Sequence, residues 1–212
     1  MSICVCLGVR MADIYSLAKE TIKERGGIAS NADFHANGLR NYQITKLCNQ
    51  GLLERIRRGY YQLSVSEDPS DETIISRLFP DGILCMDSAL FHYGYSDRTP
   101  LEWTIAFPRF VSRTRLRTRT PIIKPYFIQE DLFTLGKTEE EINGVLLSIY
   151  DRERTICDCF KYQNKIDSEL FNKAILVYAK DMKKNIGNLS AYAKKMRVYK
   201  KVAEIMGVLI NG

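Results

Sequence analysis

Apolar residues near the N-terminus recur every three or four positions, which predicts two short amphipathic helices. The first helix has an apolar face formed by Ile14, Leu17, Ala18, Thr21 and Ile22. It ends at the glycine pair Gly26 and Gly27. Ser30, followed by Asp33, has the form of a capping box and predicts the start of the second helix. Asn37 and Gly38 predict its end.

A third helix and two strands are predicted next. The helix begins after Leu39 and ends at Gly51. Its inward face is formed by Ile44, Leu47 and Cys48. Residues 52–63 form two short strands that meet near Arg58 and Gly59, and the residues that can cover the helices are Ile56, Tyr61 and Leu63. Three helices followed by a hairpin predict a winged helix-turn-helix domain over residues 11–65.

The outward face of the third helix and the hairpin supply the candidate DNA-binding residues Arg40, Asn41, Tyr42, Gln43, Lys46, Arg55, Arg57, Arg58 and Tyr60. Arginines at the hairpin tip can neutralise phosphates, and the amides of Asn41 and Gln43 can pair with an adenine edge. The alternative is a packing or protein-binding domain in which Arg57 and Arg58 are a solvated turn. The basic hairpin beside a polar helix face favours DNA.

The remaining chain predicts a second, larger domain. Residues 66–71 are polar, include a proline and lack periodic apolar positions, which indicates a linker. Over residues 72–212, alternation predicts a strand at 103–107, and further strands are expected at 122–128 and 145–150. Helical spacing follows from Arg152 onward. Strands grouped before helices are typical of an α+β domain, so the fold class is a winged helix-turn-helix followed by a mixed α+β domain with a helical end.

A second basic stretch follows the first strand of this domain, with Arg109, Arg113, Arg115, Arg117, Arg119 and Lys124 and no acidic residue between them. The alternating arginines would project from one face of an extended segment, as a charged ribbon for a phosphate backbone or an acidic partner. An equally supported alternative is a hairpin whose solvated charges protect a sheet edge.

Acid, base and hydroxyl groups also come together at Glu153, Arg154, Thr155 and Asp158, which raises a catalytic hypothesis. A structural role is favoured. Asp151 or Thr155 can cap a helix, Glu153 can stabilise its positive end, and Arg154 can pair with Asp158 one turn on. Cys157 and Cys159 have no neighbouring histidine to act as a base. We therefore expect no enzymatic activity.

Composition changes this picture little. The formal net charge of +6 favours a polyanionic partner without requiring one. Six cysteines without a CxxC pair and two separate histidines predict no metal site, and no cofactor is expected. The absence of a secretory signal or membrane-spanning apolar run, together with free thiols, predicts a cytoplasmic protein. Residues 1–10 are expected to be a poorly ordered leader, with Met11 as a plausible start.

Several segments occur in an order that resembles a known family. In the first domain these are Gly26-Gly27, Gly38-Leu39 and Asn49 to Tyr61, and in the second they are Asp87 to Leu90, Tyr93-Gly94, Pro100, Ile105 to Arg109, Glu153 to Thr155 and Asp158. This collinear set resembles the AbiEi-type antitoxins of bacterial type IV (abortive infection) toxin-antitoxin systems. The resemblance implies that the winged helix represses its own promoter at inverted repeats. It also implies that the second domain counters a nucleotidyltransferase-like toxin without needing a stable complex.

The favoured function is therefore a DNA-binding repressor and antitoxin. One alternative is a stand-alone winged-helix regulator whose second domain dimerises or senses an effector. Another is a nucleic-acid enzyme such as a nuclease, for which we expect no activity. An adjacent toxin gene would separate the antitoxin from the stand-alone regulator.

Overall fold

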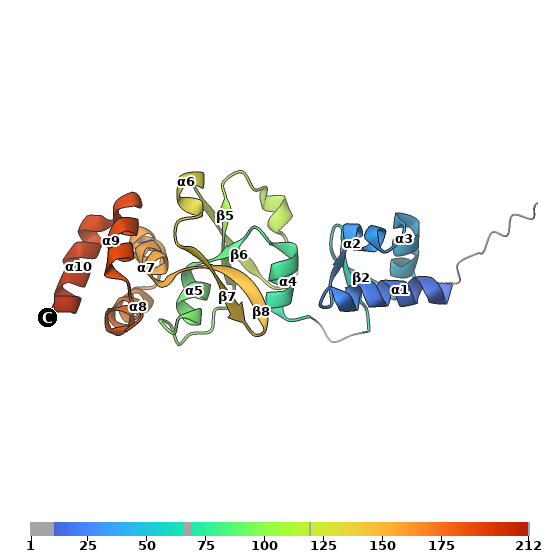
Figure 1. The fold of residues 1–212 in the computed structure, drawn as a ribbon, viewed down its shortest axis with the longest axis horizontal. Coiled ribbons are helices and arrows are strands. Elements are labelled where there is room, and N and C mark those ends of the chain that lie inside the picture. The colour runs from blue at the N-terminus through green and yellow to red at the C-terminus, as the bar shows by residue number, and fades with distance from the viewer. Residues whose placement is uncertain (1–10, 66–68, 119, 212) are drawn as a thin grey trace, which may run out of the picture. The chain divides into compact units, whose positions relative to one another are not determined.

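The chain divides into two units, Met1–Leu78 and Phe79–Gly212. Figure 1 shows the computed structural model, which describes residues 11–65, 69–118 and 120–211. The predicted leader (residues 1–10), Arg119 and residues 66–68 of the predicted linker lie outside the described residues.

The first unit has the element order expected of a winged helix-turn-helix. Its elements are α1 (Met11–Glu24), β1 (Ala29–Ser30), α2 (Asn31–Ala36), α3 (Asn41–Asn49), β2 (Leu53–Arg57), β3 (Tyr60–Leu63) and α4 (Asp71–Leu78). The three strands pair antiparallel in the order β1-β3-β2, and β2 with β3 is the wing. The predicted hairpin is confirmed, whereas the sequence had not indicated β1.

The core of the first unit is formed by the apolar faces that the periodicity predicts. Ala18, Phe34 and Leu47 are fully buried, and the Phe34 ring lies 5.9 Å from that of Tyr61 on β3. Leu17 is the exception, because it lies at the border of the α1 face and is 36% exposed. Burial of these side chains from all three helices and the wing stabilises the unit.

The boundary of the first unit differs from the linker predicted at residues 66–71, because α4 is grouped with the winged helix. Arg77 on α4 pairs with Asp33 on α2, with 2.9 Å between Nη2 and Oδ2. Arg57 on the wing donates from Nη2 to the carbonyl oxygen of Leu78 at 3.2 Å. These long-range polar contacts hold α4 to the winged helix, and local composition does not reveal them.

The second unit is built on a five-stranded mixed sheet with strand order β6-β5-β4-β8-β7. The strands are β4 (Ile83–Leu84), β5 (Trp103–Pro108), β6 (Ile123–Ile128), β7 (Lys137–Ile142) and β8 (Val145–Tyr150). β4 pairs parallel with β8 and antiparallel with β5, β5 pairs parallel with β6, and β7 pairs antiparallel with β8. The strands predicted at 103–107, 122–128 and 145–150 are confirmed.

The sequence had not indicated β4 or β7. The β7–β8 hairpin turns at Asn143 and Gly144, whose φ angles are 50° and 79°. Asparagine followed by glycine is the preferred pair for such a two-residue turn, so a local signal for this hairpin was present. β4 has only two residues, both of them buried, and is too short to show the alternation that would predict a strand.

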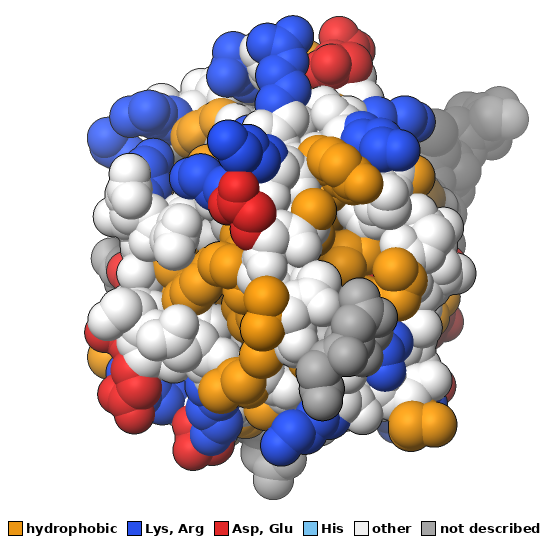
Figure 2. Space-filling view, turned by 90° about the vertical axis from the view of Figure 1, so that its left-hand side faces the viewer, with side chains coloured by type: hydrophobic (Ala, Val, Ile, Leu, Met, Phe, Trp, Pro, Cys, Tyr) orange, Lys and Arg blue, Asp and Glu red, His pale blue; other side chains and the backbone are white. Residues whose placement is uncertain are grey.

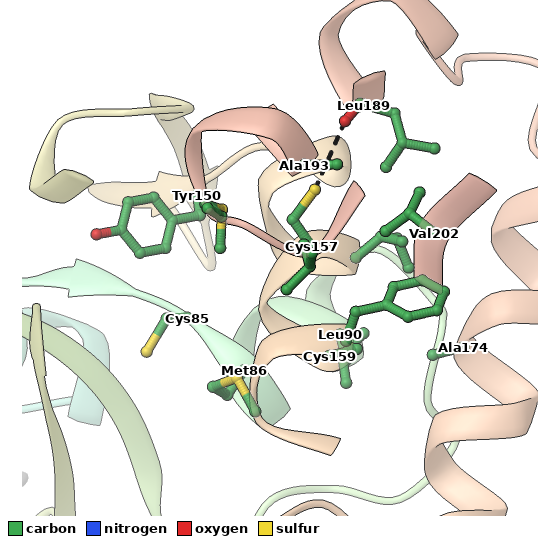
Figure 3. Close-up of a cluster of buried hydrophobic side chains, with 14 of the residues drawn as sticks. Cys85, Met86, Leu90, Tyr150, Cys157, Cys159, Ala174, Leu189, Ala193 and Val202 are labelled. Carbon is green, nitrogen blue, oxygen red and sulfur yellow. Dashed lines mark hydrogen bonds between the residues drawn. The ribbon is translucent and has the colours of Figure 1, made fainter. Parts of the chain in front are cut away.

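Helices complete the second unit and share one core with the sheet. They are α5 (Met86–His92), η1 (Arg113–Leu116), α6 (Glu130–Phe133), α7 (Arg152–Lys161), η2 (Gln163–Lys165), α8 (Ser168–Lys180), α9 (Ile186–Lys195) and α10 (Tyr199–Asn211). Figure 3 shows Cys157 of α7 among this core, where its thiol donates to the carbonyl oxygen of Leu189 at 3.7 Å. Cys85, Cys157 and Cys159 are buried free thiols. The predicted helical C-terminal part is confirmed.

Within the described part of the chain, no helix combines the length and the apolarity needed to cross a bilayer. Figure 2 shows the face formed by the C-terminal helices, where apolar side chains are exposed between lysine and arginine side chains. Among the exposed apolar residues of α9 and α10 are Ile186, Tyr199, Ile205 and Val208.

Candidate nucleic-acid interface

One face of α3 is polar and exposed. Ile44 and Leu47 turn into the core, and the opposite arc of the helix carries Asn41, Tyr42, Thr45, Lys46 and Asn49. Tyr42 is 66% exposed although it is aromatic. Thr45 and Asn49 were missing from the residues selected by sequence, but their helical spacing from Lys46 and Tyr42 would have indicated them. This arc is long enough to present several side chains to a groove.

The two amide residues proposed as base readers differ in the structure. Gln43 is half-buried, and its Oε1 accepts a hydrogen bond from the backbone N–H of Arg40 at 2.7 Å. A bidentate pair with adenine needs that same oxygen, so Gln43 caps the helix instead of presenting both amide groups. Asn41 is exposed, and its Oδ1 lies 2.9 Å from Nε2 of His35. Both amide oxygens therefore have a partner within the domain, and the two residues differ in exposure, with Asn41 the more accessible. The base-reading role of either residue stays a prediction.

A bulge in the wing separates the arginines that sequence had grouped together. Arg55 is opposite Tyr61 and Arg57 is opposite Tyr60, with a register shift between them. Because consecutive residues of β3 point to opposite faces, Arg55 and Arg57 also point to opposite faces. In a strand without the bulge the two would share one face.

On its side of the bulge, the Arg57 side chain makes contacts within the protein. Its guanidinium donates to the carbonyl oxygen of Leu78 and lies 4.7 Å from the centroid of the Tyr60 ring. Arg55 and Arg58 are exposed, and among the described residues neither has an ion-pair partner. Burial raises the pKa of the Cys48 thiol on α3, and the positive charge of Arg55 partly offsets this effect. Arg55 and Arg58 are therefore the wing cations available to a phosphate.

Asp33 joins the three elements that position α3 and the wing. Its Oδ2 accepts from the backbone N–H of Ser30 at 2.8 Å and from its hydroxyl at 2.7 Å, which confirms the predicted capping box. It also pairs with Arg25, the residue that directly follows α1, at 3.0 Å and with Arg77 of α4. Burial alone would raise the pKa of Asp33, but the Ser30 hydrogen bonds and the two guanidinium groups outweigh it and lower that pKa.

Replacing Asp33 with asparagine is expected to lower the free energy of unfolding of the first unit by about 1–2 kcal/mol at neutral pH. The folded pKa is depressed, so the stabilisation is present above the unfolded value of about 3.9 and disappears as pH falls through the folded pKa. The difference between D33N and the natural protein should therefore shrink below about pH 4. Far-UV circular dichroism during thermal unfolding measures it, with exposed Asp13→Asn as the control. A difference independent of pH would contradict the charge-based explanation.

The predicted arginine ribbon is wrong in its conformation. Arg113–Leu116 form the short 3-10 helix η1, so these arginines do not lie along one extended face. Because β5 and β6 are parallel, the connection between them is a crossover, which also excludes the hairpin alternative. Arg115 is neutralised by Asp81 through two hydrogen bonds of 2.8 and 2.7 Å. Arg109, Arg113 and Arg117 are exposed, and their role in binding remains a prediction.

The cluster formed by Glu153, Arg154, Thr155 and Asp158 on α7 is buried in the interior. Arg154 and Asp158 are each 1% exposed, and Nε of Arg154 lies 3.2 Å from both carboxylate oxygens. Nη1 of Arg154 also donates to the carbonyl oxygens of Leu132 and Leu135 at 2.6 and 2.8 Å. The predicted Arg154–Asp158 pair is confirmed, and Asp151 caps the helix by accepting from the Arg154 N–H. These groups connect α7 to α6 and to the segment between α6 and β7.

Glu153 is buried in the same network. Its Oε1 accepts from the Tyr178 hydroxyl at 3.2 Å and from the Asn185 N–H at 2.7 Å, which connects α7 to α8 and to the start of α9. Among the described residues, no group of three or more His, Cys, Asp or Glu side chains could hold a metal ion.

Three helices and an antiparallel wing define the first unit as a winged helix-turn-helix. Residues 16–64 match the family described as "Transcriptional regulator, AbiEi antitoxin". The similarity to the AbiEi antitoxin regulators therefore applies to the N-terminal winged helix-turn-helix.

The architecture of the whole chain is similar to that of a solved structure, the RV2827C protein from Mycobacterium tuberculosis. The two share 13% sequence identity with a TM-score of 0.65, and the match covers 95% of this chain and 78% of that one. At this identity the likeness shows the fold. Comparison with curated protein sequences gave no match.

Proposed function

We propose that this protein is a DNA-binding transcriptional repressor and the antitoxin of a type IV toxin-antitoxin system. The observation that carries the proposal is the match of residues 16–64 to the AbiEi antitoxin regulators. This segment includes the polar face of α3 and the wing arginines Arg55 and Arg58, which form no ion pairs among the described residues. The proposal places α3 in the major groove and the wing against the phosphate backbone.

The side chains at this interface have three different roles. Asn41, Tyr42 and Thr45 present hydrogen-bonding groups that can contact base edges. Arg40, Lys46, Arg55 and Arg58 supply positive charge that releases counterions from the phosphates. Gln43, Arg57 and Tyr60 support the geometry of α3 and the wing. Binding to inverted repeats in its own promoter would repress the operon.

The second unit supplies the antitoxin activity in this proposal, acting without catalysis in the cytoplasm against a nucleotidyltransferase-like toxin. Support for this part is the family match at the N-terminus, and a direct complex with the toxin is not required. Expression of the adjacent gene with and without this protein tests it. Toxicity relieved by this protein supports the antitoxin, and a harmless neighbouring gene would favour a stand-alone regulator.

The direct test of repression is binding to a labelled fragment of the protein's own upstream region, compared with a scrambled fragment across about 50–200 mM salt. Replacing Asn41 with alanine should cost about 1–3 kcal/mol on the specific fragment alone, because base contacts distinguish sequences. Lys46→Ala is the matched control on the same helix face. It should weaken binding to both fragments alike, because phosphate contacts carry no sequence information.

Equal losses on both fragments for Asn41→Ala would remove its base-reading role. Salt-sensitive binding to both fragments by the natural protein would indicate a general DNA binder. No binding at all would leave the winged helix with a protein-contact function.

A further inference from the structure

A pocket of about 530 Å³ lies at the edge of the five-stranded sheet, outside the proposed DNA interface. It is lined by three cations and three aromatic rings, which are Arg113, Lys124, Lys165, Tyr126, Phe127 and Tyr162. They come from η1, from the edge strand β6 and from the segment that follows α7. The described residues lining this pocket include no Asp or Glu.

The aromatic rings stand beside the cations. The Tyr126 and Tyr162 rings meet edge to face, with centroids 5.5 Å apart and an interplanar angle of 67°. Nζ of Lys165 lies 5.7 Å from the Tyr162 ring, and Cζ of Arg113 lies 5.4 Å from the Phe127 ring. All three rings are half-buried, so each is held by the core and keeps an accessible surface.

The pocket also keeps its positive charge. Arg113, Lys124 and Lys165 are exposed, and in the described parts of the chain none forms a salt bridge. Arg115, only two residues from Arg113, is neutralised by Asp81. The charge of Lys124 acts on Asp87 of α5: burial raises the pKa of Asp87, and Lys124 offsets only part of that rise. Three cations around aromatic surfaces therefore remain for an anionic ligand.

We propose that this pocket binds a nucleotide unit of single-stranded nucleic acid. A base would stack on the tyrosine rings while Arg113, Lys124 and Lys165 contact the flanking phosphates, which is the combination that unpaired strands require. An acidic peptide adding a strand to β6 fits less well, because Pro125 has no backbone N–H to donate from this edge. This site shares no residue with the winged helix, and the proposal stands whether or not the protein represses a promoter.

The test uses the full chain and fluorescein-labelled oligouridylate and oligothymidylate, followed by fluorescence anisotropy. Replacing Tyr162 with alanine should weaken binding roughly fivefold to a hundredfold, the range expected when one base–aromatic stack is removed. Tyr162→Phe keeps the ring and should change the affinity less than about twofold. Preference for either strand supports the proposal and identifies the source as RNA or DNA.

Exposed-residue variants keep the test valid if Tyr162→Ala fails to fold. Lys165→Ala and Arg113→Ala should each reduce the salt dependence by about 0.7 for each phosphate that the variant no longer neutralises. Arg117→Ala is the matched control, because Arg117 is exposed on the same crossover but does not line the pocket. Its salt dependence should equal that of the natural protein.

Two results would overturn the proposal. One is the absence of an effect at the pocket, seen either as single-strand binding that is unchanged in Lys165→Ala and Arg113→Ala or as no binding by the natural protein at low salt. The other is loss of single-strand binding in the double variant Arg55→Ala and Arg58→Ala, which would move the site to the winged helix. Competition by free uridine monophosphate would also support binding in this pocket, and it would show that a mononucleotide is sufficient for binding.

Discussion

Replacing Arg154 with methionine should lower the free energy of unfolding of the second unit by about 3–5 kcal/mol. The substitution removes the cation that neutralises Asp158 at a position where both side chains are 1% exposed. It also leaves the carbonyl oxygens of Leu132 and Leu135 without the donor that reaches them at 2.6 and 2.8 Å. A buried carboxylate without its cation, and one buried and one partly buried carbonyl group that lose this donor, are the physical source of the loss.

The measurement follows urea-induced unfolding by fluorescence of Trp103, the single tryptophan of the chain, which lies on β5 in the second unit. Arg115→Met is the matched control, because it breaks a bidentate pair whose partners are 43% and 37% exposed. That loss should be at most about 1 kcal/mol. Similar losses for the two variants would show that burial does not determine the cost.

A second substitution tests the cause of the Arg154→Met loss. Combining Arg154→Met with Asp158→Leu removes the uncompensated carboxylate and should recover much of the stability, as apolar pairs often replace buried ion pairs. No recovery would assign the loss to the carbonyl groups and to the interaction with the Tyr150 ring, whose centroid lies 4.1 Å from Cζ of Arg154.

Replacing Arg55 and Arg58 together with alanine should weaken binding to DNA of any sequence by about ten- to a hundredfold for each phosphate hydrogen bond removed, the equivalent of about 1.5–3 kcal/mol per charged hydrogen bond. The salt dependence should fall by about 0.9 for each phosphate that is no longer neutralised. Both side chains are exposed, so the stability of the first unit should change little. A salt series on the upstream and scrambled fragments measures these effects.

Arg57→Ala provides the control on the same hairpin. Arg57 bonds the Leu78 carbonyl oxygen and stacks on Tyr60, so its removal should lower stability and leave the salt dependence nearly unchanged. A slope reduced as much by Arg57→Ala as by Arg58→Ala would show that Arg57 leaves α4 to contact DNA. Unchanged slopes in all variants would exclude the wing from the interface.

Local sequence signals predicted much of the first unit. The spacing of Ile14, Ala18 and Ile22, the Ser30–Asp33 capping box and the turn at Gly59 are each specified by residues close together in the chain. The strands at 103–107, 122–128 and 145–150 and the Arg154–Asp158 pair also depend on neighbouring positions. The Asn143-Gly144 turn is equally local, although the strand before it was not predicted.

Tertiary structure decided which side chains are available for binding. The bulge in β2 turns Arg57 toward α4, and capping withdraws Gln43 from the exposed face of α3. Because β5 and β6 pair in parallel, the segment between them is a crossover and not the extended ribbon that was expected. Arg113 on this crossover lies beside Phe127.

The sequence by itself determined most of the helices, most of the strands and the class of the first unit, because periodicity and caps act over a few residues. Only the tertiary structure decided the pairing of the strands, the place of α4 and the partners of the arginines. These depend on contacts between residues far apart in the chain, such as Arg77 with Asp33 and Arg115 with Asp81, which no local pattern encodes.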